Sequence, residues 1–238
     1  WTVDQAVDKI RGQKGTVVKL RIIRDGKEEK TFEITREAID IPSVESKMLD
    51  GQVGYIKITQ FGDDTSDLTR KAVQSLVNQE AKSYILDLRG NPGGYLDAAV
   101  DVSSLWLENK VVLKEKRAGK VIQTYNSRGT APLKDVPTVV LIDGGSASAS
   151  EITAGALHDN GAATLIGAKS FGKGSVQQPE NLDNGGILKV TIARWFTPKD
   201  KNIDKEGIKP DVAVDRSAQD IQSGTDPQLD KALEKLRR

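Results

Sequence analysis

The sequence has 238 residues, a length that accommodates one or two ordinary domains. Its 35 lysine and arginine residues nearly balance its 34 aspartate and glutamate residues, so the net charge of +1 gives no electrostatic reason to expect nucleic acid or an acidic lipid surface as a partner. There is no run of 18 apolar residues, no cysteine and only one histidine, which excludes a membrane span in this chain, a disulfide scaffold, a thiol enzyme and most zinc sites.

The first 35 residues predict a helix followed by a β-hairpin. Residues 2–10 fit a helix that opens with a capping box and places its apolar residues on one face. Alternating residues predict strands over 16–24 and 30–35, and Asp25 and Gly26 between them form a strong turn signal. A helix and a hairpin are too small for an independent domain, so we interpret this segment as the later part of a small module.

From about Val53 onward, strand patterns alternate with helix patterns, which is typical of an α/β fold. We expect strands near residues 53–59, 84–88, 110–116, 120–125, 138–142, 163–166, 186–195 and 211–214. We expect helices that begin near residues 64, 95 and 148, and a last helix with Leu229, Ala232, Leu233 and Leu236 on one stripe. In the first of these helices, Leu68, Ala72 and Leu76, flanked by Val73 and Val77, form the expected buried face.

Two junctions between a strand and a helix could support chemistry. In the first, Asn91-Pro92-Gly93-Gly94, paired glycines allow a sharp turn or a close backbone approach. In the second, residues 144–151 place three serines at the start of a helix, where exposed N–H groups can hold an anion or a developing oxyanion. The ordinary interpretations are a glycine turn and a capping box with Ser148 as its first residue.

A nucleophilic serine needs a base, and the only histidine is badly placed to be one. His158 lies ten positions beyond Ser148 on the same expected helix, about 15 Å along its axis, which excludes a Ser–His–Asp triad built on Ser148. We therefore expect His158 to be a structural or surface residue. Lys173 remains as a candidate, because it lies between two glycines and burial would lower the pKa of a lysine by several units. A solvated lysine in a glycine turn is the ordinary alternative.

Two other motifs overlap this lysine. Residues 167–173 match the first positions of a phosphate-binding loop, but Gly174 replaces the required Ser or Thr and no helix can follow, so we reject that motif. Ser170 and Lys173 also satisfy the Ser-x-x-Lys pattern of penicillin-binding enzymes. Neither Ser-Asp-Asn nor Lys-Thr-Gly appears downstream, and the pattern stays open as an alternative.

Taken together, these blocks resemble the C-terminal processing peptidases, also called tail-specific proteases. Their content, order and spacing match from about Ile39 to Val214, in the stretches 54–58, 87–94, 145–152 and 171–177. The resemblance implies an α/β fold whose strand–helix alternating serine-protease core is crotonase/Clp-like, over residues 39–238, preceded by the C-terminal part of a PDZ domain over residues 1–38. The first strand and the carboxylate-binding loop of that PDZ module would be absent from this chain.

The resemblance also implies a serine endopeptidase with a Ser–Lys dyad that needs no metal and no cofactor. The family's nucleophile falls on Ser148, its general base on Lys173, and the glutamine that assists the lysine on Gln177. The family spacing of 25 positions between nucleophile and base selects Ser148 over its neighbouring serines. Oxyanion donors would be the backbone N–H groups of Gly94 and Ala149, and we expect a structural role for Asp159.

Partners implied by the resemblance are protein or peptide substrates with exposed C-terminal tails, and a homo-oligomer is an open expectation. The chain begins at Trp1, so we expect a processed or trimmed product whose targeting segment lay upstream. The family and the absence of cysteine favour an extracytoplasmic location. Besides the penicillin-interacting acyl transferase on Ser170, a catalytically silent binding module, with Ser148 serving only as a helix cap, is the remaining alternative.

Overall fold

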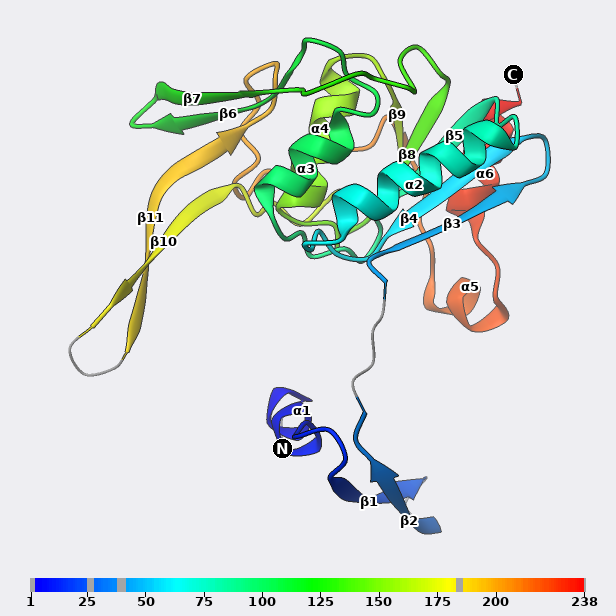
Figure 1. The fold of residues 1–238 in the computed structure, drawn as a ribbon, viewed down its shortest axis with the longest axis vertical. Coiled ribbons are helices and arrows are strands. Elements are labelled where there is room, and N and C mark those ends of the chain that lie inside the picture. Colours follow the sequence, from blue (N-terminus) through cyan, green and yellow to red (C-terminus); the bar gives the residue numbers. More distant parts are fainter. Residues whose placement is uncertain (1–2, 25–27, 38–41, 183–185, 238) are drawn as a thin grey trace. The chain divides into compact units, whose positions relative to one another are not determined.

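A computed structural model describes residues 3–24, 28–37, 42–182 and 186–237. The chain forms two compact units, Trp1–Ile41 and Pro42–Arg238 (Figure 1). The first unit contains helix α1 (Val3–Ile10) and the antiparallel strands β1 (Val17–Arg24) and β2 (Glu28–Thr35). The expected helix and both expected strands are present, whereas the expected turn at Asp25 and Gly26 lies outside the described residues.

Arg36 ties the helix of the first unit to its hairpin. Its Nε donates to the Ile10 carbonyl at 2.7 Å and its Nη1 donates to Thr16 Oγ1 at 2.8 Å. A guanidinium at the C-terminus of a helix satisfies a carbonyl that has no partner within the helix and interacts favourably with the helix dipole. Nothing in these contacts tests whether the unit is part of a PDZ domain, which stays a prediction.

The second unit is built from two sheets and five helices within its described residues. Its strands are β3 (Val44–Leu49), β4 (Val53–Ile58), β5 (Ser83–Asp87), β6 (Val111–Arg117), β7 (Lys120–Asn126), β8 (Thr138–Ile142), β9 (Thr164–Gly167), β10 (Ser175–Asn181), β11 (Ile187–Phe196) and β12 (Val212–Ala213). Its helices are α2 (Thr65–Asn78), α3 (Leu96–Ser103), α4 (Ala149–Asp159), α5 (Ala218–Ser223) and α6 (Pro227–Leu236).

The larger sheet has the strand order β12-β9-β8-β5-β4-β3. All neighbouring strands in it are parallel except β3, which pairs antiparallel with β4. The smaller sheet, β10-β11-β6-β7, is antiparallel, and its β10–β11 hairpin extends away from the larger sheet (Figure 1). The alternation of strands and helices confirms the predicted α/β class.

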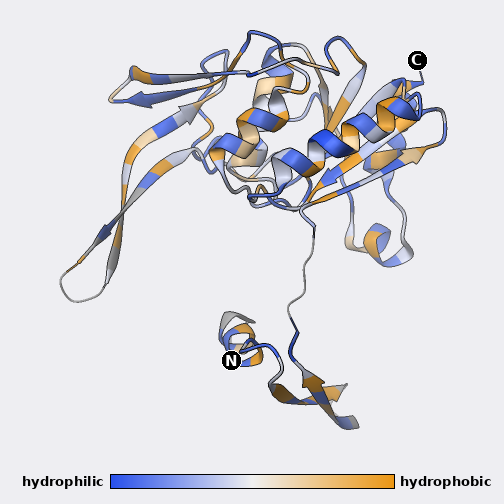
Figure 2. Ribbon diagram, viewed as in Figure 1, coloured by the Kyte–Doolittle hydropathy of each residue, from blue (hydrophilic) through white to orange (hydrophobic). Residues whose placement is uncertain are grey.

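Strands β5 and β8 are buried along their whole length because helices cover both faces of the larger sheet. Alternate residues such as Leu86 and Val140 join the core formed with α2, α3 and α4, and the intervening Ile85 and Leu141 pack against α6. In Figure 2 α2 alternates orange and blue, as expected for a helix with one buried face.

The structure contains elements that were not predicted, and one residue expected to be buried is exposed. The sequence did not predict β3, β10 or α5. Within α2, Ala72, Val73 and Leu76 are buried as expected, but Val77 is 43% exposed because it lies on the outer side of the helix. Within the described part of the chain, no helix combines the length and the apolar character that crossing a bilayer requires.

Candidate active site

The predicted site residues gather at one edge of the larger sheet. Because β5, β8 and β9 are parallel, the loops that follow them lie at the same edge, where α/β proteins usually bind ligands. The loop after β5 contains Gly94, the junction after β8 contains Ser148, and the loop after β9 contains Lys173. The fold therefore brings together three segments that are far apart in the sequence.

Asn91 fixes the shape of the loop after β5. Its buried side chain donates from Nδ2 to the Ile58 carbonyl at 2.8 Å and accepts from the Gly93 N–H at 2.9 Å. Gly93 and Gly94 have φ angles of 98° and 146°, which L side chains rarely adopt. A Cβ on Gly94 would also overlap the Phe61 carbonyl, so this turn requires glycine.

The loop after β5 contacts the serine-rich junction directly. The Asn91 carbonyl accepts from the Ala147 N–H and from Ser150 Oγ, both at 3.0 Å. A Cβ added to Gly93 would lie 2.6 Å from the Ala147 carbonyl oxygen and 2.7 Å from Ser148 Cβ, so only glycine allows this approach. The backbone beside Gly94 is thereby held against Ser148.

The three serines of the junction have different environments. Ser146 is buried, donates to the Leu88 carbonyl at 2.8 Å and accepts from the Asp143 N–H. Ser150 is also buried, with its hydroxyl committed to the Asn91 carbonyl. Ser148 is half-buried, and its hydroxyl donates no hydrogen bond to any group in the described residues. Of the three, Ser148 alone has a hydroxyl proton that is not engaged in holding the fold.

The backbone at Ser148 is strained, with φ 54° and ψ −114° at the N-cap of α4. The next N–H, that of Ala149, points from the first turn of the helix, and neither it nor the Gly94 N–H donates a hydrogen bond to the described part of the protein. A strained serine at the junction of a strand and a helix, with unpaired N–H groups beside it, is the arrangement typical of nucleophiles in α/β hydrolases.

Glu151 joins the serine junction to the loop after β9, and sequence reasoning missed this role. Its carboxylate is fully buried and accepts four hydrogen bonds. Oε2 accepts from the N–H groups of Ser148 and Lys173, both at 2.8 Å. Because the two backbone nitrogens share this acceptor, they lie close to each other. Oε1 accepts from Ser170 Oγ at 2.6 Å and from the Gly172 N–H at 2.7 Å. The capping-box pattern was the available signal, but it identified only the bond to Ser148.

The Lys173 side chain is exposed, contrary to the expectation that it would be buried. Its backbone is nevertheless fixed, because Gly172 has a φ of 91° and a Cβ on Gly174 would overlap the backbone at Asp204. No hydrogen bond joins Ser148 Oγ to Lys173 Nζ among the described residues. Gln177 is exposed too, and it follows a bulge at the start of β10.

Ser170, the nucleophile of the alternative Ser-x-x-Lys interpretation, is a buried structural residue. Its hydroxyl donates to Glu151 Oε1 and accepts from the Ile208 N–H, both at 2.6 Å. Both hydrogen-bonding directions are therefore used within the fold, and the structure offers no support for a nucleophile at Ser170.

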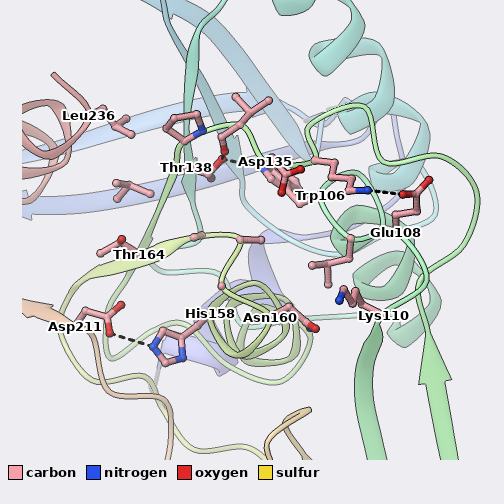
Figure 3. A pocket seen from close by; sticks show the side chains of 18 of the residues that line it. Trp106, Glu108, Lys110, Asp135, Thr138, His158, Asn160, Thr164, Asp211 and Leu236 are labelled. Atoms are coloured by element: carbon pink, nitrogen blue, oxygen red, sulfur yellow. Dashed lines mark hydrogen bonds and ion pairs between the residues drawn. The ribbon is translucent and has the colours of Figure 1, made fainter. Parts of the chain in front are cut away.

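His158 lies at the other end of α4, as expected from the spacing. Its Nε2 is 3.0 Å from Asp211 Oδ1 and its Nδ1 is 3.2 Å from Asp159 Oδ1. Figure 3 shows its ring directed toward Asp211 at the side of a cleft of about 1200 Å³. Residues at the amino ends of β8 and β9, such as Thr138 and Thr164, also line this cleft, so it lies at the sheet edge opposite Ser148.

Asp159 is buried and has the structural role that was expected for it. It accepts hydrogen bonds from Thr197 Oγ1 and the Lys199 N–H. Burial raises the pKa of Asp159, but these bonds outweigh it, and the pKa lies below its ordinary value.

Comparison with known proteins agrees with the resemblance seen in the sequence. The profile of peptidase family S41 matches residues 52–214. A carboxyl-terminal-processing protease of Synechocystis sp. is 41% identical over 244 residues, which cover 99% of this chain and 57% of that protein. The carboxy-terminal processing protease CtpA of Bacillus subtilis is 41% identical over 217 residues, which cover 90% of this chain and 46% of that protein.

The solved structure of a photosystem II D1 C-terminal processing protease superposes with a TM-score of 0.70 at 28% identity, covering 86% of this chain and 57% of that one. The sheet topology and the alternation of strands and helices define an α/β protein. The chain belongs to peptidase family S41. It spans about half the length of the curated relatives that it matches.

Proposed function

We propose that this chain is the catalytic part of a serine endopeptidase that cleaves protein substrates near their C-terminal tails, with Ser148 as nucleophile and Lys173 as general base. The observation that carries the proposal is the environment of Ser148. Among the three serines of the junction it alone keeps an uncommitted hydroxyl proton, and its strained backbone packs against Gly93. The names of the S41 relatives support the reaction class.

The proposed first step forms a bond between Ser148 Oγ and the carbonyl carbon of the scissile peptide. The hydroxyl proton passes to the neutral amine of Lys173, and negative charge develops on the carbonyl oxygen. The N–H groups of Gly94 and Ala149 are the proposed donors to that oxyanion, each contributing about 3 kcal/mol. Their lack of partners in the described residues supports this role.

In the second half of the reaction, the C–N bond breaks and the leaving amine takes the proton from the lysine ammonium. A water molecule, deprotonated by Lys173, then attacks the acyl-enzyme, and Ser148 regains its proton as the acid product leaves. Lysine acts as a base only when neutral, so the proposal includes displacement of water around Lys173 by bound substrate. Its flexible four-carbon side chain must reach Ser148 Oγ in that complex.

Gln177 is the proposed aid to the lysine. An uncharged amide cannot supply the base itself, but it can orient the amine of Lys173 by a hydrogen bond. The position of Gln177, four residues after Lys173 at the start of β10, is compatible with this role once substrate is bound.

The remaining parts of the proposal concern the whole protein. We propose that residues 1–38 are the C-terminal part of a PDZ domain, that the protein acts outside the cytoplasm, and that it can form a homo-oligomer. The support for these points is the family resemblance and the absence of cysteine.

The test is cleavage of an unfolded protein such as β-casein, followed by mass spectrometry of the products. Ser148→Ala and Lys173→Ala should each abolish cleavage while circular dichroism stays unchanged, whereas Lys169→Ala, an exposed lysine in the same loop, should cleave normally. Full activity in either of the first two variants would remove that residue from the mechanism. Equal cleavage of peptides with free and amidated C-termini would contradict selection of tails.

A further inference from the structure

The guanidinium of Arg89 is the centre of a nearly buried ion cluster beside the candidate site. Nε and Nη2 bind Asp87 at 2.9 and 2.6 Å, and Nη1 and Nη2 bind the two oxygens of Asp226 at 2.8 and 2.9 Å. Nη1 also donates to Gln228 Oε1 at 3.0 Å. Two carboxylates and one amide thus accept hydrogen bonds from all three nitrogens of the Arg89 guanidinium, and the side chain is only 11% exposed.

The partners of Arg89 come from two segments of the second unit that are far apart in the sequence. Asp87 ends β5, whereas Asp226 is the N-cap of α6 and accepts from the Leu229 N–H at 3.1 Å. Gln228 is buried and donates from Nε2 to the Val214 carbonyl at 2.7 Å. Residues 226 and 228 lie beyond the part of the chain that matches the S41 profile.

Arg89 is also the residue directly before the loop that presents Gly94. The Gly90 N–H donates to Asp143 Oδ1 at 2.8 Å, and the same oxygen accepts from the Gly145 N–H at 2.9 Å. The loop then continues through Asn91 to Gly93, which abuts Ser148. A shift of the Arg89 side chain would therefore move the start of the segment that positions the Gly94 N–H.

We propose that Asp226 is a positioning residue: through Arg89, the N-terminus of α6 holds the Gly90–Gly94 loop in the geometry that catalysis needs. The inference rests on the proposed function for its catalytic consequence, but the effect on the loop stands independently. It assigns a role in the site to the C-terminal helix, which contacts neither Ser148 nor Lys173 in any described interaction.

The experiment uses the 238-residue chain with Asp226→Asn and Asp226→Ser. Asparagine and serine are both good N-cap residues, so the start of α6 is kept while the carboxylate is removed. Val73→Ala, in α2 on the other face of the sheet, is the control for general destabilisation. Hydrogen–deuterium exchange of the peptide spanning residues 89–95 is the first readout, since its amides of Gly90, Asn91, Gly93 and Tyr95 are hydrogen-bonded.

Removing one partner of a buried ion pair should loosen the loop. We therefore expect the rate of hydrogen–deuterium exchange in this peptide to rise by about tenfold in both Asp226 variants but not in Val73→Ala. On β-casein we expect kcat to fall by about tenfold with little change in KM, because a misplaced oxyanion donor affects the transition state alone. Exchange no faster than in Val73→Ala would overturn the inference.

The two proposals can fail separately. If the unaltered chain does not cleave β-casein and Ser148 is not labelled by a fluorophosphonate, the proposed function fails, whereas the exchange data still decide whether Asp226 fixes the loop. If the chain is active and the Asp226 variants retain full kcat despite a loosened loop, Asp226 has no role in catalysis and the inference is wrong.

Discussion

Replacing Glu151 by glutamine tests whether one buried carboxylate holds the nucleophile and the base segments together. All four of its partners are donors, three N–H groups and the Ser170 hydroxyl. In Glu151→Gln one oxygen becomes an NH₂ group, which is itself a donor and faces two donors. Two of the four hydrogen bonds are lost if the NH₂ group faces Ser148 and Lys173. One is lost if it faces Ser170 and Gly172, because the Ser170 hydroxyl can turn and accept from it while still accepting from the Ile208 N–H.

Each buried donor left without a partner costs about 1–3 kcal/mol, so the loss of one or two bonds should lower the free energy of unfolding of Glu151→Gln by about 1–6 kcal/mol. Urea unfolding followed by tryptophan fluorescence measures this, since Trp106 and Trp195 are buried. Glu108→Gln makes the same chemical change in an exposed ion pair with Lys134 and should leave the midpoint almost unchanged. If both variants unfold at the same urea concentration, the Glu151 hydrogen bonds do not hold these loops.

Three further outcomes follow from the site geometry. Gly93→Ala should reduce turnover by about a hundredfold because its Cβ would displace Ser148, whereas Gly144→Ala, with open space around its Cβ and no positive φ, should stay active; similar rates in the two would refute the close approach. Ser148→Gly should be more stable to urea than Ser148→Ala by about 1 kcal/mol, since glycine tolerates a positive φ, and equal stability would argue against strain. The pKa of Asp159 is below its ordinary value of 3.8, so its charge stabilises the fold above that pH, and this contribution is lost as the pH falls through the lower folded pKa. The free energy of unfolding of Asp159→Asn should therefore decrease less steeply with falling pH in the acid range than that of the unaltered chain. The same pH dependence in both proteins would contradict this.

Whether a strand could be predicted from the sequence depends on what that strand packs against. Strands β5 and β8 were recognisable because burial on both faces leaves an uninterrupted apolar run. Strand β10 contains two glutamines and a proline, and it forms only because β11 pairs with it along its length. No property of residues 175–181 taken alone distinguishes that strand from a loop, so the pairing partner decides the structure.

The candidate site was predictable in residue types but not in geometry. The order of the glycine pair, the serine and the lysine along the chain could be read, because each lies at a turn with a strong local signal. The exposure of Lys173 could not be read, since it depends on which segments cover the loop after β9. The bond from Arg89 to Asp226 spans 137 positions, and neither residue has a local pattern that requires the other.

Glu151 explains why the structural and the catalytic interpretation of the serine junction could not be separated beforehand. In the sequence, Ser148 and Glu151 satisfy a capping box, and the structure contains its reciprocal bond. A carboxylate accepts about four hydrogen bonds, and one cap bond leaves three, which here come from residues 170–173. Glu151, the third residue of α4 and a member of its capping box, therefore also fixes the backbone of Lys173 beside that of Ser148, so a capping role for Ser148 does not exclude a catalytic one.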